Sequence, residues 1–236
     1  MDSLSFSIGR IRSMEAFLLD NETLLRIASA KDFEGAFSVL SENRYWADRI
    51  QKLESASSFS LLLDRETESF LSLMKELCPG QPEIKALASI YYGRLSSEIY
   101  LSALEKAAAL SQSKVFKRFS SAKRIFSAIK YSLLDRPVSA DVMIAKHAFS
   151  DFAKQIIVAV EEFKRSGSLD LLDKESDDAG MKAVKPAKYT AFGVDPLIGF
   201  FAAKETEIKN LRLILSSKDL GIHIDKIKPR LRMSYV

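Results

Sequence analysis

Glycine and proline are scarce in this sequence, and their scarcity limits the folds that the chain can adopt. The 236 residues include nine glycines and six prolines, too few for the many turns of a sheet protein of this length. Apolar residues instead recur at spacings of three and four along most of the chain, which is typical of amphipathic helices. No segment indicates a strand. The sequence therefore predicts an all-α, multi-helix fold.

Several positions indicate where the helices begin and end. Asp20 and Asp32 each precede an apolar periodic segment and suit the N-cap position, and the sequence PGQP at residues 79–82 ends one helix and opens the next. Residues 166–180 are polar and acidic, and residues 181–194 have no clear period. We expect 166–194 to form a long loop, with a short helix at LDLLD, residues 169–173, as the alternative. We expect residues 1–236 to form a single all-α domain, with helices at residues 4–19, 65–78, 83–110, 114–134, 139–165 and 196–217.

Little in the sequence supports catalysis. It contains neither a GxxxxGK[ST] phosphate-binding loop nor a GxGxxG dinucleotide fingerprint. His147 and His223 have no second metal ligand at helical spacing, and a single cysteine, Cys78, cannot build a zinc site. Adjacent acids such as Glu161 and Glu162 point apart on a helix. We therefore expect no enzymatic activity from the isolated chain, no cofactor and no bound metal.

The sequence also disfavours membrane insertion and secretion. No stretch reaches the roughly 18–20 uncharged apolar residues that a spanning helix needs. The opening MDSLSFSIGR carries an acid at position 2 and no long apolar run, unlike a signal peptide. The single cysteine excludes an internal disulfide and suits a reducing cytosol. We expect a cytoplasmic chain that reaches membranes only through other proteins.

The predicted helix at 114–134 is strongly basic. Its apolar residues step by three and four and form one stripe, so the simplest interpretation is a core-facing stripe with a solvated basic back. The alternative is a docking face for an acidic protein or lipid headgroups, formed by Lys117, Arg118, Lys123 and Arg124. Nucleic-acid binding is disfavoured, because the aromatic residues belong to the stripe and are not free to stack on bases. Net charge is −4 over residues 1–113 and +8 over residues 114–236, which favours ordered docking to partners.

The predicted helix at 196–217 places charges among apolar residues. Asp195 suits its N-cap and Pro196 its first turn. One stripe contains Glu205 and Arg212 between apolar residues, and a lone buried charge is expensive. We therefore expect Glu205 and Arg212 to be buried and paired, and Glu207 and Lys209 to lie on milder faces. The alternative is a surface helix with ordinary pairs such as Glu205–Lys209.

Two segments resemble one known family. The C-terminal sequence PLIGFFAAKETEIKNLRLIL, followed by GIHIDKIKPRLRMSYV, is similar to the signature of the C subunit of V/A-type rotary ATPases, a family that includes the d subunit of the eukaryotic V-ATPase. The N-terminal sequence GRIRSMEAFLLDNETLLRIASAKDFEGAFSVLSENRYW is similar to the family's opening. The family signature, which the resemblance implies is structural, consists of Arg10, Arg12, Glu15, Pro196, Glu205, Glu207, Asn210 and Arg212.

The resemblance implies a non-catalytic component of the rotor's central stalk. Such a component forms a collar on the cytoplasmic side of the membrane proteolipid ring, receives the foot of the central shaft and passes torque between them. In such a complex, ATP hydrolysis drives proton or sodium transport, or proton or sodium flow drives ATP synthesis. Family members consist of three related helical units arranged as a funnel, and this shorter chain is expected to hold fewer than three. The residues themselves leave open a free-standing α-helical adaptor with a soluble partner, or a basic-helix protein on membranes or RNA.

Overall fold

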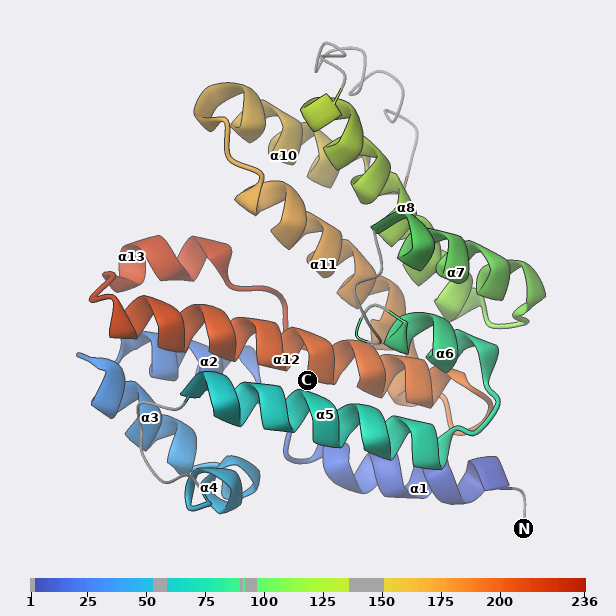
Figure 1. Ribbon diagram of the computed structural model, residues 1–236, viewed down its shortest axis with the longest axis horizontal. Coiled ribbons are helices and arrows are strands. Elements are labelled where there is room, and N and C mark those ends of the chain that lie inside the picture. Colours follow the sequence, from blue (N-terminus) through green and yellow to red (C-terminus); the bar gives the residue numbers. More distant parts are fainter. Residues whose placement is uncertain (1–2, 53–58, 90, 92–96, 136–150) are drawn as a thin grey trace. The chain divides into compact units, whose positions relative to one another are not determined.

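The computed structural model describes residues 3–52, 59–89, 91, 97–135 and 151–236, and every regular element in these ranges is a helix (Figure 1). The prediction of an all-α fold is therefore confirmed. The chain forms two compact units, where the sequence predicted a single domain. Unit 1 consists of Met1–Pro79 and Ala191–Val236, and unit 2 of Gly80–Thr190. The funnel arrangement stays a prediction.

Unit 1 is built around the long helix α12, which contacts α1, α2, α3 and α5. The predicted caps are confirmed: the Asp20 carboxylate accepts a hydrogen bond from the Thr23 backbone N–H at 2.7 Å, and Asp32 accepts one from Gly35 at 2.9 Å. The helices of unit 1 are α1 (Ser3–Glu15), α2 (Asn21–Ser29), α3 (Phe33–Ser41), α4 (Arg44–Ile50), α5 (Phe59–Leu77), α12 (Asp195–Asp219), α13 (Ile224–Ile227) and the 3-10 helix η3 (Lys228–Arg230).

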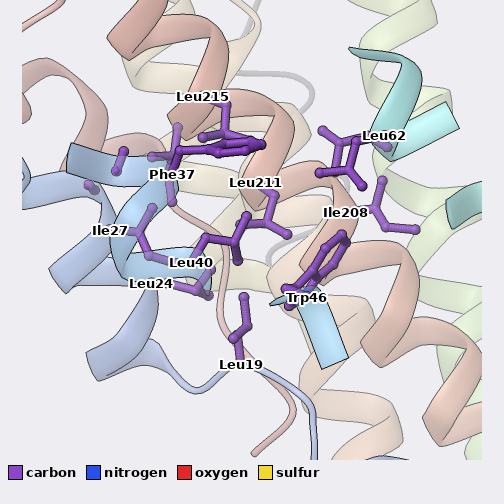
Figure 2. Packing of buried hydrophobic residues seen from close by; sticks show 14 of the residues in the cluster. Leu19, Leu24, Ile27, Phe37, Leu40, Trp46, Leu62, Ile208, Leu211 and Leu215 are labelled. Carbon is purple, nitrogen blue, oxygen red and sulfur yellow. The ribbon is translucent and has the colours of Figure 1, made fainter. Parts of the chain in front are cut away.

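The core of unit 1 joins the two ends of the sequence. Figure 2 shows apolar side chains from α2, α3, α4, α5 and α12 that meet in one cluster. Leu211 and Leu215 of α12 are fully buried there beside Leu40 of α3 and Trp46 of α4. Burying such side chains contributes about 1.5–3 kcal/mol each. The cluster therefore fixes the C-terminal helix to the N-terminal segment.

Unit 2 is a set of helices in which α8 contacts α7 and α11, and α11 contacts α10. The apolar stripe predicted on α8 is confirmed, since Phe119, Ala122, Phe126 and Ile129 are all buried. Ile156 and Val160 of α10 and Leu172 of α11 pack against this stripe. The helices of unit 2 are α6 (Pro82–Ala88), α7 (Ser97–Leu110), α8 (Lys114–Asp135), α10 (Ala153–Ser166), α11 (Asp170–Val184) and the 3-10 helix η2 (Lys185–Tyr189).

The long loop predicted at 166–194 is wrong, because most of this segment forms α11 and η2. The acids that obscured its period lie against cations of α8: Lys123 pairs with Asp177, and Lys130 pairs with Asp173 at 2.7 Å. Gly180 lets the two helices approach closely, since a Cβ added there would lie 3.1 Å from the Phe119 ring. Sequence periodicity cannot detect a helix whose polar residues are matched by a neighbouring helix.

Other expected boundaries differ by a turn or more. Helix α5 begins at Phe59, earlier than expected. The N-cap expected at Asp195 is wrong, because Asp195 is the first residue of α12 and Val194 takes the N-cap position. The helix expected at 83–110 corresponds to α6 and α7, with residues 90 and 92–96 outside the described residues. The beginning of the helix expected at 139–165 also lies outside the described residues, and its described part is α10.

Candidate functional site

Helix α12 carries several of its charges inside unit 1. Lys204 and Glu207 are only 3% and 4% exposed, and Glu205 and Asn210 are buried as well. The cause is the position of α12 among four other helices, which leaves few of its faces in contact with solvent. Because burying an isolated charge costs several kcal/mol, each of these groups requires a partner.

Lys204 lies at the centre of the buried charges. Its Nζ lies 2.6 Å from Glu207 Oε1, one turn along α12, and 3.0 Å from Glu66 Oε1 on α5. The ammonium also lies 4.2 Å from the centroid of the Tyr45 ring and 4.7 Å from that of Trp46. A cation between two carboxylates and two ring faces is stabilised from several sides.

Glu66 joins the α12 charges to α4. Its carboxylate accepts hydrogen bonds from the Tyr45 hydroxyl at 2.5 Å and from the Arg49 Nε–H. The Arg49 guanidinium also lies over the Tyr45 ring, 3.4 Å from its centroid. Burial, together with the negative charge of Glu66, raises the pKa of the Tyr45 hydroxyl. Tyr45 therefore stays protonated and donates to Glu66.

Glu207 extends the same network to the N-terminal segment, because its Oε2 accepts a hydrogen bond from the Leu19 backbone N–H at 2.7 Å. We call Arg49, Glu66, Lys204 and Glu207 the α12 charge cluster. Its two cations and two carboxylates balance in charge, and each carboxylate holds hydrogen bonds. The ion pairs and hydrogen bonds of the cluster join α4, α5, α12 and the N-terminal segment into one network.

The C-terminal segment and the end of α12 are held to the same unit by polar side chains. The Asn210 side chain donates to the Arg232 carbonyl and accepts from the Arg232 backbone N–H, both at 2.9 Å. The Ser234 backbone N–H donates to Asn21 Oδ1 at 3.0 Å. Lys218 Nζ donates to the Ala30 carbonyl at 2.5 Å. These contacts hold the C-terminal segment against α12, and the role that the resemblance implies for Asn210 stays a prediction.

The N-terminal signature residues lie in the same unit. Arg12 Nη1 lies 2.6 Å from Glu15 Oε2, and the Arg12 guanidinium also interacts with the Tyr235 hydroxyl. Arg10 forms a more exposed pair with Glu76 at 2.8 Å. Pro196 is buried in the first turn of α12. Segments from the two ends of the sequence thus meet within unit 1.

Arg212 is paired, as expected, but the expectation that it is buried is wrong. Its side chain is 44% exposed and pairs at 2.8 Å with Asp64, which is 58% exposed. Glu205 is buried, as predicted, and its partner is Lys209 at 3.0 Å. The mild face assigned to Glu207 is also wrong, since this side chain is buried. A stripe argument assumes one buried face, whereas α12 buries several.

The four candidate docking residues of α8 differ in their exposure and in their ion-pair partners. Lys123 is largely buried in its pair with Asp177, so it is not available to a partner. Arg118 and Arg124 are exposed and pair with Asp151 at 3.3 Å and Glu105 at 2.6 Å. Lys117 is exposed. The basic face is therefore partly neutralised by neighbouring helices.

Two further expectations concern metals and membranes. Within the described ranges, no group of three or more His, Cys, Asp or Glu side chains is placed to hold a metal ion. No helix in the part of the chain that the structure describes combines the length and the apolar character needed to cross a membrane.

Cys78 is buried, and burial raises the pKa of its thiol to about 12.

A model of the ATP synthase (C/AC39) subunit family matches residues 99–230, more than half of the chain. The chain belongs to this family. The predicted resemblance to the C subunit of V/A-type ATPases is thereby confirmed. The match covers most of unit 2 and the whole of α12, including the middle of the sequence, where the residues alone did not indicate the family.

Three relatives of known name are C subunits of A-type ATP synthases or of a V-type ATPase. The C subunit of an A-type ATP synthase from Methanothermobacter thermautotrophicus is 32% identical over 38% of this chain, and the C subunit of a V-type sodium ATPase from Enterococcus hirae is 34% identical over 37%. The C subunit of a second A-type ATP synthase, from Methanocaldococcus jannaschii, is 32% identical over 34%. The aligned part spans about a quarter or less of each relative: 24%, 25% and 19%.

Sequence reasoning missed several members of the α12 charge cluster. Glu66 and Arg49 are ordinary members of charged segments, and nothing in their spacing points to a helix that begins more than 120 residues later in the sequence. Lys204 offered a signal, because it follows seven consecutive uncharged residues, Leu197–Ala203, at the start of a helix. Because lysine is almost never fully buried without a partner, a lysine next to such a run is a candidate for a buried ion pair.

Proposed function

We propose that this chain is a non-catalytic central-stalk subunit of a V/A-type rotary ATPase, which couples the central rotor shaft to the membrane proteolipid ring. In this role it serves ATP-driven or ATP-synthesising proton or sodium transport. It lies on the cytoplasmic side and contacts the membrane only through other subunits. The family match over residues 99–230 carries the proposal, supported by relatives named as ATPase and ATP synthase subunits.

The physical character of unit 1 supports a mechanical role. A protein that transmits torque needs elements that do not deform under load. Helix α12 is enclosed by four helices and tied to both α5 and the N-terminal segment by buried ion pairs and hydrogen bonds. Close-packed interiors transmit strain well. The α12 charge cluster offers no exposed base or nucleophile, which agrees with a non-catalytic role.

Copurification tests this assignment. The full chain, with an affinity tag, is expressed in cells that contain a V/A-type ATPase, and membranes are solubilised in a mild detergent. We expect proteolipid and shaft subunits to copurify with the chain, and the purified chain alone to hydrolyse no ATP. Capture of a soluble partner without proteolipid would support the adaptor instead. Turnover of ATP that follows the chain through repurification would contradict the non-catalytic assignment.

The exposed cations of α8 are the docking face that we propose for an acidic partner protein of the complex. Lys117 is exposed, and the pair between Arg118 and Asp151 is exposed on both sides, so neither cation is needed for the core. The variant Lys117→Glu/Arg118→Glu should weaken copurification of the ring or shaft. Lys75→Glu on α5 makes the same type of change at an exposed position of unit 1 and serves as the control. Equal effects of the two variants would refute this docking face.

A further inference from the structure

A hollow of about 240 Å³ opens beside the α12 charge cluster, at the junction of α4 and α5. Four of its lining residues recur on one face of α5: Leu62, Arg65, Glu66 and Ser69. This spacing of three, four and seven places their side chains above one another on the helix. The other walls are Arg49, at the end of α4, and Lys52, which follows it. The hollow is thus lined by three cations, a hydroxyl, a buried carboxylate and one apolar side chain.

The charges around the hollow do not balance. The Glu66 carboxylate already has partners: it accepts hydrogen bonds from Tyr45 and Arg49 and forms an ion pair with Lys204. The four charges of the α12 charge cluster cancel, so its carboxylates leave no charge to neutralise the outer wall. Among the residues that the structure describes, Lys52 and Arg65 therefore contribute a surplus of two positive charges.

Neither of these two cations forms an ion pair with any residue that the structure describes. The exposed acids at helical spacing from them, Asp48 and Glu68, are not paired with them. Exposed cations on a helix commonly pair with an acid three or four residues away. Here both are oriented to line the hollow instead.

We propose that this hollow binds a doubly charged phosphate group. Two positive charges match one phosphate monoester or hydrogen phosphate dianion. The planar guanidinium of Arg65 suits two phosphate oxygens at once, and the Lys52 ammonium provides a mobile point charge. The Ser69 hydroxyl is an additional donor on the same face of α5. The site lies wholly within unit 1 and is independent of the proposed rotary function.

Titration calorimetry of the full chain with inorganic phosphate tests the site. The variants are Arg65→Gln and Lys52→Gln, whose exposed side chains leave the core unchanged. Lys75→Gln removes one exposed cation from the same helix outside the hollow, and serves as the matched control. A parallel experiment uses flotation with phosphatidylcholine vesicles that contain a phosphorylated phosphatidylinositol, because the phosphate group could be free or part of a lipid headgroup.

We expect saturable binding of one phosphate group per chain. Each hollow variant should weaken binding about tenfold, which corresponds to about 1.4 kcal/mol, while Lys75→Gln leaves binding unchanged. The same pattern with vesicles alone would assign the phosphate to a lipid headgroup. Absence of saturable binding in both experiments would overturn the proposal. Equal weakening by all three variants would do so too, because it would reflect only the net charge of the chain.

Discussion

Helices α8 and α12 are both long and rich in charge, but several charges of α12 are buried whereas most cations of α8 are exposed. On α8, a single apolar stripe faces α7, α10 and α11, and cations such as Arg118 and Arg124 remain exposed. On α12, Lys204, Glu205 and Glu207 are buried among four helices. The charge pattern of a helix therefore does not decide whether its ion pairs are buried, because burial depends on how closely neighbouring helices enclose each residue.

The largest effect that separates the two helices is expected at Lys204. Lys204→Met keeps much of the side-chain volume but leaves Glu66 and Glu207 buried without their shared cation. Removing one partner of a buried pair costs about 3–5 kcal/mol, a large share of the stability of a typical domain. Urea unfolding followed by circular dichroism measures the loss. A stability within about 1 kcal/mol of the unchanged protein would mean that the cluster is not needed to hold α12.

A smaller effect is expected at Asn210, whose amide forms two hydrogen bonds to the backbone of Arg232. Asn210→Ala leaves a partly buried N–H and carbonyl without partners, at about 1–3 kcal/mol for each unsatisfied group. We expect a loss of about 2–3 kcal/mol in the free energy of unfolding. Hydrogen exchange should also show faster exchange of the Arg232 amide. Unchanged exchange at that amide would contradict the role assigned to Asn210.

An intermediate case on α8 is Lys123, which pairs with Asp177 in a largely buried position. We expect Lys123→Ala to lower the free energy of unfolding by about 1–2 kcal/mol. This is more than the loss of an exposed pair, which costs at most about 1 kcal/mol, and less than the loss of a fully buried pair. Arg124→Ala, which breaks only the exposed pair with Glu105, is the control on the same helix. Chemical denaturation of both variants provides the comparison. Equal shifts of the denaturation midpoint in Lys123→Ala and Arg124→Ala would contradict this prediction.

The smallest effect is expected at Arg212, although it lies on the same helix as Lys204. Its pair with Asp64 is exposed on both sides, and exposed ion pairs contribute at most about 1 kcal/mol. Arg212→Ala should therefore lower the free energy of unfolding by less than about 1 kcal/mol. A loss as large as that of Lys204→Met would show that exposure does not separate the two pairs.

The sequence predicted the local features and missed the relations between distant segments. The caps at Asp20 and Asp32 and the apolar stripe of α8 were predictable, because each depends on residues within one helix. Helix α11 was missed because its acids are paired with Lys123 and Lys130 on another helix. Local periodicity contains no information about such pairs, so it predicted a loop.

The same limit applies to the candidate site. The sequence identified α12 as unusual and placed Glu205 in the interior, but it exchanged the environments of Arg212 and Glu207. The error arose because a single stripe was taken as the buried face. Glu66 could not be found from α12 alone, since its partner Lys204 lies more than 130 residues away in the sequence. The family was indicated by the resemblance of the two terminal segments, and the apolar stripe alone did not indicate it.

The buried network of α12 is tested most directly by two double-mutant cycles measured under the same conditions. One cycle combines Lys204→Met with Glu66→Gln, and the other combines Arg212→Gln with Asp64→Asn. Residues in direct contact in a buried network couple by about 0.5–3 kcal/mol. We predict a coupling in the upper part of that range for Lys204 and Glu66, and one of at most about 1 kcal/mol for the exposed pair of Arg212 and Asp64. Equal coupling energies in the two cycles would contradict the account.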